Sequence, residues 1–374
     1  MASSSVDAID RRKHKLSSKG QDLISNLPDH IIGYILYFLS TKEAVRTSVL
    51  SKKWIYLWKF ITKLDFDDKN HFSLNKIRKK GFVDFVDRVL LHLNSAHIQS
   101  FSLKMSEEYN YFYINSFNIN KWISVVVNLR VRNLCIYLKK GLEIQLVSFD
   151  ALFKCQSLEE LVLNGCAFTL PSFVCLSSLT ILKLSRITIT CDSSNESKTL
   201  ALNFPALRKY ETLDCTFLNV KSVTLQVPLL EVVSISYDPF YHKSHCEIKF
   251  YATRLAKFCY SGYMSDTILL EAHSVAFADI ALYDDNEKSL QEIGIFVCKL
   301  LSINPESLKL QMFGRTLQSV MFVRILNHSF EDIPPFGRLS HLELNSVGCK
   351  YLLAILLQSP CLETNFTGLS RETF

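Results

Sequence analysis

One short segment carries residue types that could hold a metal ion. It places His242, His245 and Cys246 within five residues, and imidazole and thiolate groups are ligands that Zn²⁺ prefers. A fourth ligand is not evident, and none of the 11 cysteines forms a C-x-x-C pair. We therefore interpret the segment as a polar loop, and we expect no metal and no cofactor.

The motifs of the common enzyme classes are missing. The sequence contains no Walker-type loop, no G-x-G-x-x-G, no G-x-S-x-G and no H-E-x-x-H. The adjacent acidic pairs at 107–108, 159–160 and 284–285 indicate solvated faces, not two acids across a cleft. A cysteine nucleophile with a histidine partner stays open as a third hypothesis, because 11 Cys and 10 His allow many chance pairs. We predict no catalytic residue.

Composition favours a chain with a large folded core. Of 374 residues, 48% are hydrophobic, and 26 Phe and 15 Tyr are among them. The net charge of +6 lies almost entirely in residues 1–60, so the rest offers no basic stripe for nucleic acid. No apolar run reaches the roughly 20 residues of a membrane span, and residues 1–20 lack the apolar stretch of a signal peptide. We expect a cytoplasmic and/or nuclear protein with free thiols, in which Arg11–Lys15 is a nuclear address or part of a flexible arm.

Apolar side chains crowd the segment that must position any N-terminal site. Ser40 and Glu43 form an S-x-x-E capping box that starts a helix, and Pro28 suits the first turn of the helix before it. The apolar positions at helical spacing are Ile31, Ile32, Ile35, Leu36 and Leu39, with Val49 and Trp54 following. So small a unit cannot bury them all. The pattern alone leaves two interpretations open, a cap on a larger domain or a docking module.

A repeat of the form L-x-x-L-x-L follows. Its middle positions between 134 and 258 are 21 to 28 residues apart, which is typical of leucine-rich repeats. The copies are Ile98/Phe101/Leu103, Val131/Leu134/Ile136, Leu158/Leu161/Leu163, Leu179/Leu182/Leu184, Leu207/Tyr210/Thr212, Leu230/Val233/Ile235, Leu255/Phe258/Tyr260 and Leu339/Leu342/Leu344, with degenerate copies at Val275/Ala278/Ile280 and Leu317/Val320/Phe322.

Each L-x-L places two apolar side chains on one face of a strand, and stacked repeats share a core beneath a parallel sheet. The alternative is an ordinary α/β or all-β domain. The residues between the leucines face away from the core, and a binding surface for a target is predicted there. Our candidates for target binding are Glu160, Asn164, Lys183, Lys209 and Glu211.

The N-terminal segment resembles an F-box of the plant type. The resemblance rests on D-x-I-S-x-L-P-D-x-I-I at 22–32 and T-K-E-A-V-R-T-S-V-L-S-K-x-W-x-x-L-W at 41–58. Its one departure is Lys53, where Arg is commoner and a surface position is expected. The resemblance implies docking onto a Skp-type adaptor, which attaches the protein to a cullin–RING ubiquitin ligase. The matching adaptor-facing or supporting positions are Leu27, Pro28, Ile31, Ile32, Ile35, Leu36, Leu39, Val49 and Trp54.

With the repeats, the chain resembles the large plant F-box/leucine-rich-repeat group of the FBD-associated type. That resemblance implies an α/β fold, in which a three-helix F-box precedes an irregular leucine-rich-repeat solenoid with a parallel β-sheet horseshoe. We expect a disordered arm at 1–20, the F-box at 21–60 and a helical transition at 61–97, which holds an amphipathic helix around 82–90. The repeats would occupy 98–374, without the FBD domain that often follows in the group.

The resemblance also implies a function. The chain would be the substrate-recognition subunit of a Skp–cullin–F-box (SCF) ubiquitin ligase, with an unknown protein target on its repeats. No nucleic acid, membrane or enzymatic activity of its own is expected. The alternative is a leucine-rich-repeat scaffold that acts without the ligase.

Overall fold

The computed structural model describes most of the chain between residues 24 and 344. The described residues are 24, 26–71, 77–95, 97–105, 116–138, 144–145, 149–171, 173–191, 198–237, 246–262, 268–272, 275–283, 289, 300, 303–312, 337–344 and 361. Several predictions lie outside them: the arm at 1–20, the acidic pairs at 107–108 and 284–285, the two histidines of the polar loop, the degenerate copy at 317–322, and the repeat region beyond 344 apart from residue 361.

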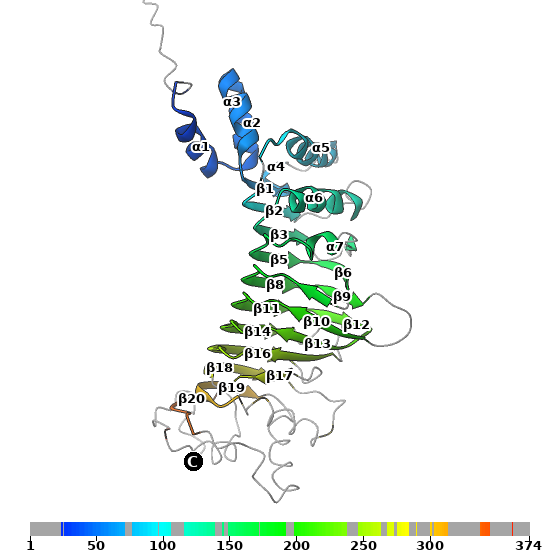
Figure 1. Ribbon diagram of the computed structural model, residues 1–374, viewed down its shortest axis with the longest axis vertical. Helices are drawn as coiled ribbons and strands as arrows, with labels where there is room; N and C mark the ends of the chain where they lie inside the picture. The colour runs from blue at the N-terminus through cyan, green and yellow to red at the C-terminus, as the bar shows by residue number, and fades with distance from the viewer. Residues whose placement is uncertain are drawn as a thin grey trace, which may run out of the picture.

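A helical unit, residues 24–60, stands at one end of the molecule (Figure 1). Its capping box is confirmed, because the Glu43 amide donates to Ser40 Oγ at 3.3 Å and the Ser40 amide donates to Glu43 Oε2 at 3.1 Å. Pro28 lies one residue before the first helix, where its φ of −57° already suits the helical turn. The elements are α1 (Asp29–Phe38), α2 (Thr41–Arg46), η1 (Thr47–Val49), α3 (Lys52–Leu57) and η2 (Trp58–Phe60).

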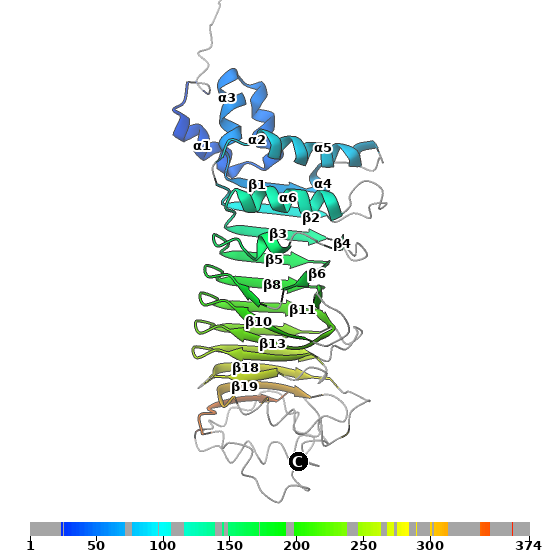
Figure 2. The same cartoon turned by 45° about the vertical axis from the view of Figure 1, so that its right-hand side comes forward.

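An eleven-stranded parallel sheet, the front sheet, forms the long axis of the molecule (Figures 1 and 2). Each strand pairs with the strand one repeat away, which confirms the stacking predicted from the leucine pattern. In spatial order the strands are β1 (Lys63–Asp67), β2 (Ser100–Met105), β3 (Asn133–Leu138), β5 (Glu160–Asn164), β8 (Ile181–Ser185), β11 (Lys209–Leu213), β14 (Val232–Ser236), β16 (Lys257–Gly262), β18 (Val275–Leu282), β19 (Pro305–Met312) and β20 (His341–Leu344).

Two strands lie where the repeat was not predicted. Strand β1 falls inside the predicted helical transition and pairs in parallel with β2, so the sheet starts before residue 98. It obeys the repeat pattern as Ile61/Leu64/Phe66, and all three side chains are buried. Strand β19 lies between β18 and β20, and Pro305 occupies the position where its first leucine would stand.

The back of the solenoid changes along its length (Figure 1). Helices cover the first repeats: α4 (Asp68–His71), α5 (Ile77–His92), α6 (Ser116–Asn128) and α7 (Phe149–Leu152). Helix α5 confirms the amphipathic helix predicted around 82–90. Two smaller parallel sheets then replace the helices. One consists of β4 (Ile144–Gln145), β6 (Cys166–Leu170), β9 (Thr188–Cys191) and β12 (Thr216–Leu218); the other consists of β7 (Phe173–Cys175), β10 (Lys198–Asn203), β13 (Val220–Gln226), β15 (Glu247–Tyr251) and β17 (Ile268–Glu271).

The core runs without a break from the helical unit through the repeats. Side chains alternate along the front strands between buried and partly exposed, as in β2 and β3. The buried set faces the helices and back strands, and Phe101, Trp122 and Phe258 are fully shielded from solvent. No described helix is long and apolar enough to cross a bilayer.

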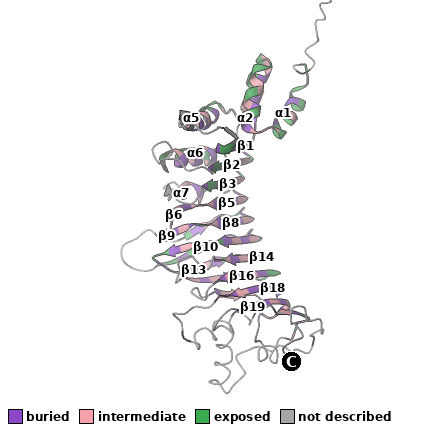
Figure 3. Ribbon diagram, turned by 180° about the vertical axis from the view of Figure 1, so that it is seen from behind, coloured by how far each residue is buried: buried purple, intermediate pink, exposed green. Residues whose placement is uncertain are grey.

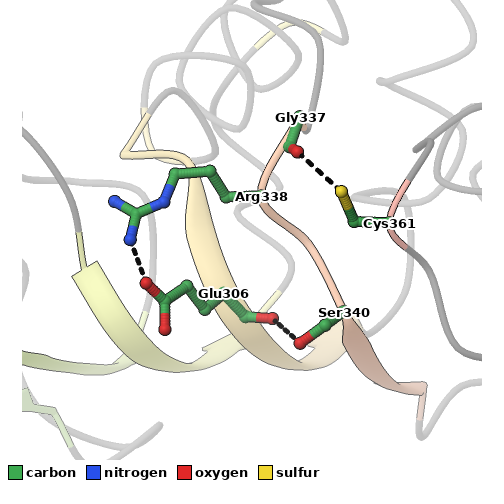
Figure 4. Close-up of polar contacts among 5 residues, drawn as sticks. All are labelled: Glu306, Gly337, Arg338, Ser340 and Cys361. Carbon is green, nitrogen blue, oxygen red and sulfur yellow. Dashed lines mark hydrogen bonds and ion pairs between the residues drawn. The ribbon is translucent and has the colours of Figure 1, made fainter.

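Polar contacts repeat along the edge where the front strands begin. The Glu306 carbonyl accepts from the amide and the hydroxyl of Ser340 at 2.8 and 3.1 Å, and the Glu159 carbonyl accepts from Thr180 in the same way at 2.8 and 2.9 Å. Figure 4 shows the Ser340 hydroxyl bond together with the Arg338–Glu306 ion pair and the Cys361 thiol, which donates to the Gly337 carbonyl at 3.2 Å. Adjacent repeats are thus fixed to one another at this edge as well as by the sheet.

Candidate functional site

The helical unit exposes a concentrated set of large apolar side chains. Sixteen such side chains are exposed among the described residues, and ten of them lie between residues 24 and 60. Figure 3 shows exposed residues on α1 beside strands that are largely buried. We call these ten the apolar patch: Ile24, Ile31, Tyr34, Tyr37, Phe38, Val49, Leu50, Ile55, Tyr56 and Phe60. Exposed apolar side chains concentrated in so small a unit favour an interaction site in it.

Helix α1 is apolar on two faces. Ile32 and Leu36 are buried against the rest of the unit, at 0% and 2% exposure. Ile31, Tyr34 and Phe38 follow one another at spacings of three and four residues, so they form a second stripe on the helix. The Tyr34 and Phe38 rings meet edge to face, 4.9 Å apart. A helix that is apolar on more than one face belongs in an interior, and here the second face is open.

The predicted adaptor-binding residues separate into three groups. Ile32, Leu36 and Trp54 are buried and hold the helices together. Leu27, Ile35 and Leu39 are half-buried against the core. Pro28, Ile31 and Val49 are exposed, Val49 at 85%. Only the exposed and half-buried groups can meet a partner without rearrangement of the unit.

Lys53 connects α3 to the start of α1. Its Nζ donates to the Leu27 carbonyl at 2.5 Å and forms an ion pair with Asp29 Oδ1 at 2.9 Å. The side chain is 35% exposed, so Lys53 lies at the surface as expected and also joins α3 to the chain segment that enters α1.

A cleft of about 190 Å³ lies beside this contact, between α1 and the chain that enters β1. Its walls include Asp29, Tyr37 and Phe60, and Lys63 Nζ lies 5.5 Å from the Tyr37 ring centroid. A Cβ added to Gly33 would meet no atom within 4 Å, so this side of α1 is open to a partner as well.

The five predicted target-binding residues all lie on the open face of the front sheet and are partly exposed. Glu211 pairs with Lys209 at 2.8 Å on its own strand and with Lys183 at 3.5 Å on the neighbouring strand. Glu160 and Asn164 lie on the next strand across, β5. Tyr137 and Leu213 expose 40% and 39% of their surface on the same face and were not among the five candidates. Both directly follow the last apolar position of a repeat copy, so the alternation along the strand could have pointed to them.

Two buried thiols in the described part of the chain offer little support for nucleophilic chemistry. Burial raises the pKa of Cys166 and Cys215 to about 12, so both stay protonated at neutral pH and pack as small apolar groups. Among the described residues, no group of three or more His, Cys, Asp and Glu side chains is placed to hold a metal ion.

Two known families match this architecture. The F-box domain matches residues 24–66, the helical unit together with most of β1. The At1g61320/AtMIF1 leucine-rich-repeat domain matches residues 89–367, from the last turn of α5 onward. The chain belongs to the F-box/leucine-rich-repeat family. Its F-box therefore carries the apolar patch, and its repeats carry the open sheet.

Curated relatives from Arabidopsis thaliana share this organisation in their names. F-box/LRR-repeat protein At4g14103 is 29% identical over 93% of this chain and 91% of its own length. F-box/FBD/LRR-repeat protein At3g14710 is 32% identical over 67% of this chain, and FBD-associated F-box protein At4g10400 is 34% identical over 58%. The chain spans only about half the length of these last two, 56% and 51%.

Proposed function

We propose that this chain is the substrate-recognition subunit of an SCF-type ubiquitin ligase. The observation that carries the proposal is the apolar patch, ten exposed large apolar side chains in the F-box. The patch is the adaptor-docking surface, and a Skp-type adaptor covers it. Burying one such side chain contributes about 1.5–3 kcal/mol. Only the surplus over the cost of association appears as affinity, so several of them must be buried together in the complex.

The open face of the repeats binds the protein target. Its side chains mix ion pairs such as Lys183–Glu211 with exposed apolar groups such as Leu213, a mixture found at protein interfaces. The receptor contributes proximity: it holds the target close to the ubiquitin carrier and raises the effective concentration of the target lysine. The other subunits supply the chemistry, and the chain itself is not an enzyme.

Co-purification tests the docking step. The full chain, co-expressed with a Skp-type adaptor, is expected to elute with it as one complex. A Leu27→Ala, Pro28→Ala double variant is expected to lower the affinity by at least tenfold, since it removes apolar contact at the start of α1. Phe173→Ala with Leu218→Ala is the matched control, because both side chains are exposed apolar groups on the back of the solenoid. An unchanged complex with the Leu27→Ala, Pro28→Ala variant contradicts the assignment.

The alternative is a leucine-rich-repeat scaffold that acts without the ligase. Immunoprecipitation followed by ubiquitin-remnant mass spectrometry separates the two functions. A receptor yields proteins whose ubiquitination falls when the adaptor-docking variant replaces the wild type. A scaffold yields the same bound proteins with no change in their ubiquitination.

A further inference from the structure

We propose that Lys53 is the positioning residue of the adaptor-docking surface: it fixes the Leu27–Asp29 segment and the start of α1 against α3. This inference rests on the proposed function, and it assigns a role to a residue inside the F-box that does not itself belong to the apolar patch. Lys53 contacts both ends of the three-residue segment, the Leu27 carbonyl and the Asp29 carboxylate.

The segment needs such an anchor because the rest of α1 is held on one side only. Ile32 and Leu36 bury one face of the helix, and the other face is the open stripe of Ile31, Tyr34 and Phe38. Hydrophobic contact is not directional, so the apolar packing of Ile32 and Leu36, with the half-buried Ile35 and Leu39, constrains the direction of the entering chain less than hydrogen bonds do. Two charge-assisted contacts to one ammonium group add a directional constraint at the end where the chain enters the helix.

The local backbone makes the anchor effective. Pro28 fixes its own φ and restricts Leu27 to an extended conformation, so Leu27, Pro28 and Asp29 form a stiff unit. On the other side, Lys53 precedes Trp54, whose indole is 2% exposed and fixes α3 in the core. The contact therefore connects a stiff entry segment to a buried anchor, and it sets where Pro28 and Ile31 point.

The test measures the dissociation constant of the full chain and a recombinant Skp-type adaptor by calorimetry, for the wild type and three variants. Lys53→Met keeps the length of the side chain and removes its charge and donors. It is expected to weaken binding about tenfold, the equivalent of one charge-assisted contact. Lys53→Arg restores donors in the same place and is expected to bind as the wild type does. Lys52→Met is the matched control, since Lys52 is the exposed neighbour on the same helix.

Thermal unfolding of each variant separates positioning from stability. A positioning role predicts that Lys53→Met binds the adaptor weakly even at temperatures far below its melting temperature. It also predicts that Lys53→Arg binds with the affinity of the wild type. If Lys53→Met does not fold, Asp29→Asn removes the ion pair from the other side, and a few-fold loss is expected. Failure of the wild type to bind the adaptor refutes the proposed function and this inference with it. A wild type that binds while Lys53→Met matches Lys52→Met refutes the positioning role alone.

Discussion

The F-box and the repeats treat apolar side chains in opposite ways. In the repeats, the front strands alternate between buried and partly exposed side chains, and residues such as Phe258 are completely shielded. In the F-box, α1 buries Ile32 and Leu36 but leaves Tyr34 and Phe38 exposed at 65% and 66%. The comparison shows that the repeats complete their own core by stacking, whereas the F-box is too small to complete its core without a partner.

Removal of a phenylalanine tests this difference in its strongest form. Phe258→Ala, in strand β16, is expected to lower the free energy of unfolding by about 3–5 kcal/mol, because it leaves a cavity in a closed core. Phe38→Ala, in α1, is expected to change it little, because that side chain is exposed. Urea unfolding of both variants measures the effect. Similar losses in the free energy of unfolding from the two variants would contradict this difference between the repeats and the F-box.

Charges placed in the apolar patch are expected to affect binding without unfolding the chain. Tyr34→Asp combined with Phe38→Asp should weaken adaptor binding about a hundredfold or more, since two apolar contacts are lost and two charges lose water on docking. Circular dichroism should stay that of the wild type. Leu218→Asp, on the back of the solenoid, is the control. Unweakened binding of the double variant would place the docking surface elsewhere.

Two glycines, one in the repeats and one in the F-box, test the same difference at the level of the backbone. Gly165 has φ +74°, and an added Cβ would lie 2.2 Å from the Leu138 carbonyl oxygen. Gly165→Ala is therefore expected to cost about 1–3 kcal/mol from backbone strain alone, with the clash in addition. Gly33 has open space and lies within a helix, so Gly33→Ala should stabilise by about 0.5–1 kcal/mol. Differential scanning calorimetry should show a lower melting temperature for Gly165→Ala and a higher one for Gly33→Ala. Shifts of the same sign would contradict the packing at these two glycines.

The capping box is expected to give the smallest effect. Ser40→Ala should lower the stability of the F-box by about 1 kcal/mol at pH 7. Hydrogen bonds from the hydroxyl and then the amide of Ser40 hold the pKa of Glu43 below its usual value. A carboxyl with a lowered pKa stabilises the fold above its unfolded-state pKa and loses that contribution as the pH falls through its folded value. The difference in the free energy of unfolding between the wild type and Ser40→Ala should therefore become smaller below about pH 4. A difference that does not depend on pH would exclude the Glu43 carboxylate from the cap.

The repeat pattern predicted most of the front sheet, and its two omissions have different causes. Ile61, Leu64 and Phe66 obey the pattern, so β1 could have been found from the sequence. At β19, Pro305 stands in the place of the first leucine and hides the repeat. The change from helices to strands on the back of the solenoid had no comparable signal, because short segments that meet an existing core show no fixed period.

The candidate docking site was only partly predictable for a physical reason. Helical spacing marks apolar faces, but α1 is apolar on two of them, so the pattern could not separate buried Ile32 from exposed Ile31. Packing decides which face is open. The contact of Lys53 with Leu27 joins residues 26 positions apart, and no local pattern encodes it.

Hydrogen exchange of the full chain, with and without a Skp-type adaptor, tests the central claim most directly. If the F-box docks through its apolar patch, the amides of α1, η1 and α3 gain protection in the complex while those of β5 to β16 stay unchanged. A complex in which protection appears on the front sheet and spares the F-box helices would contradict it.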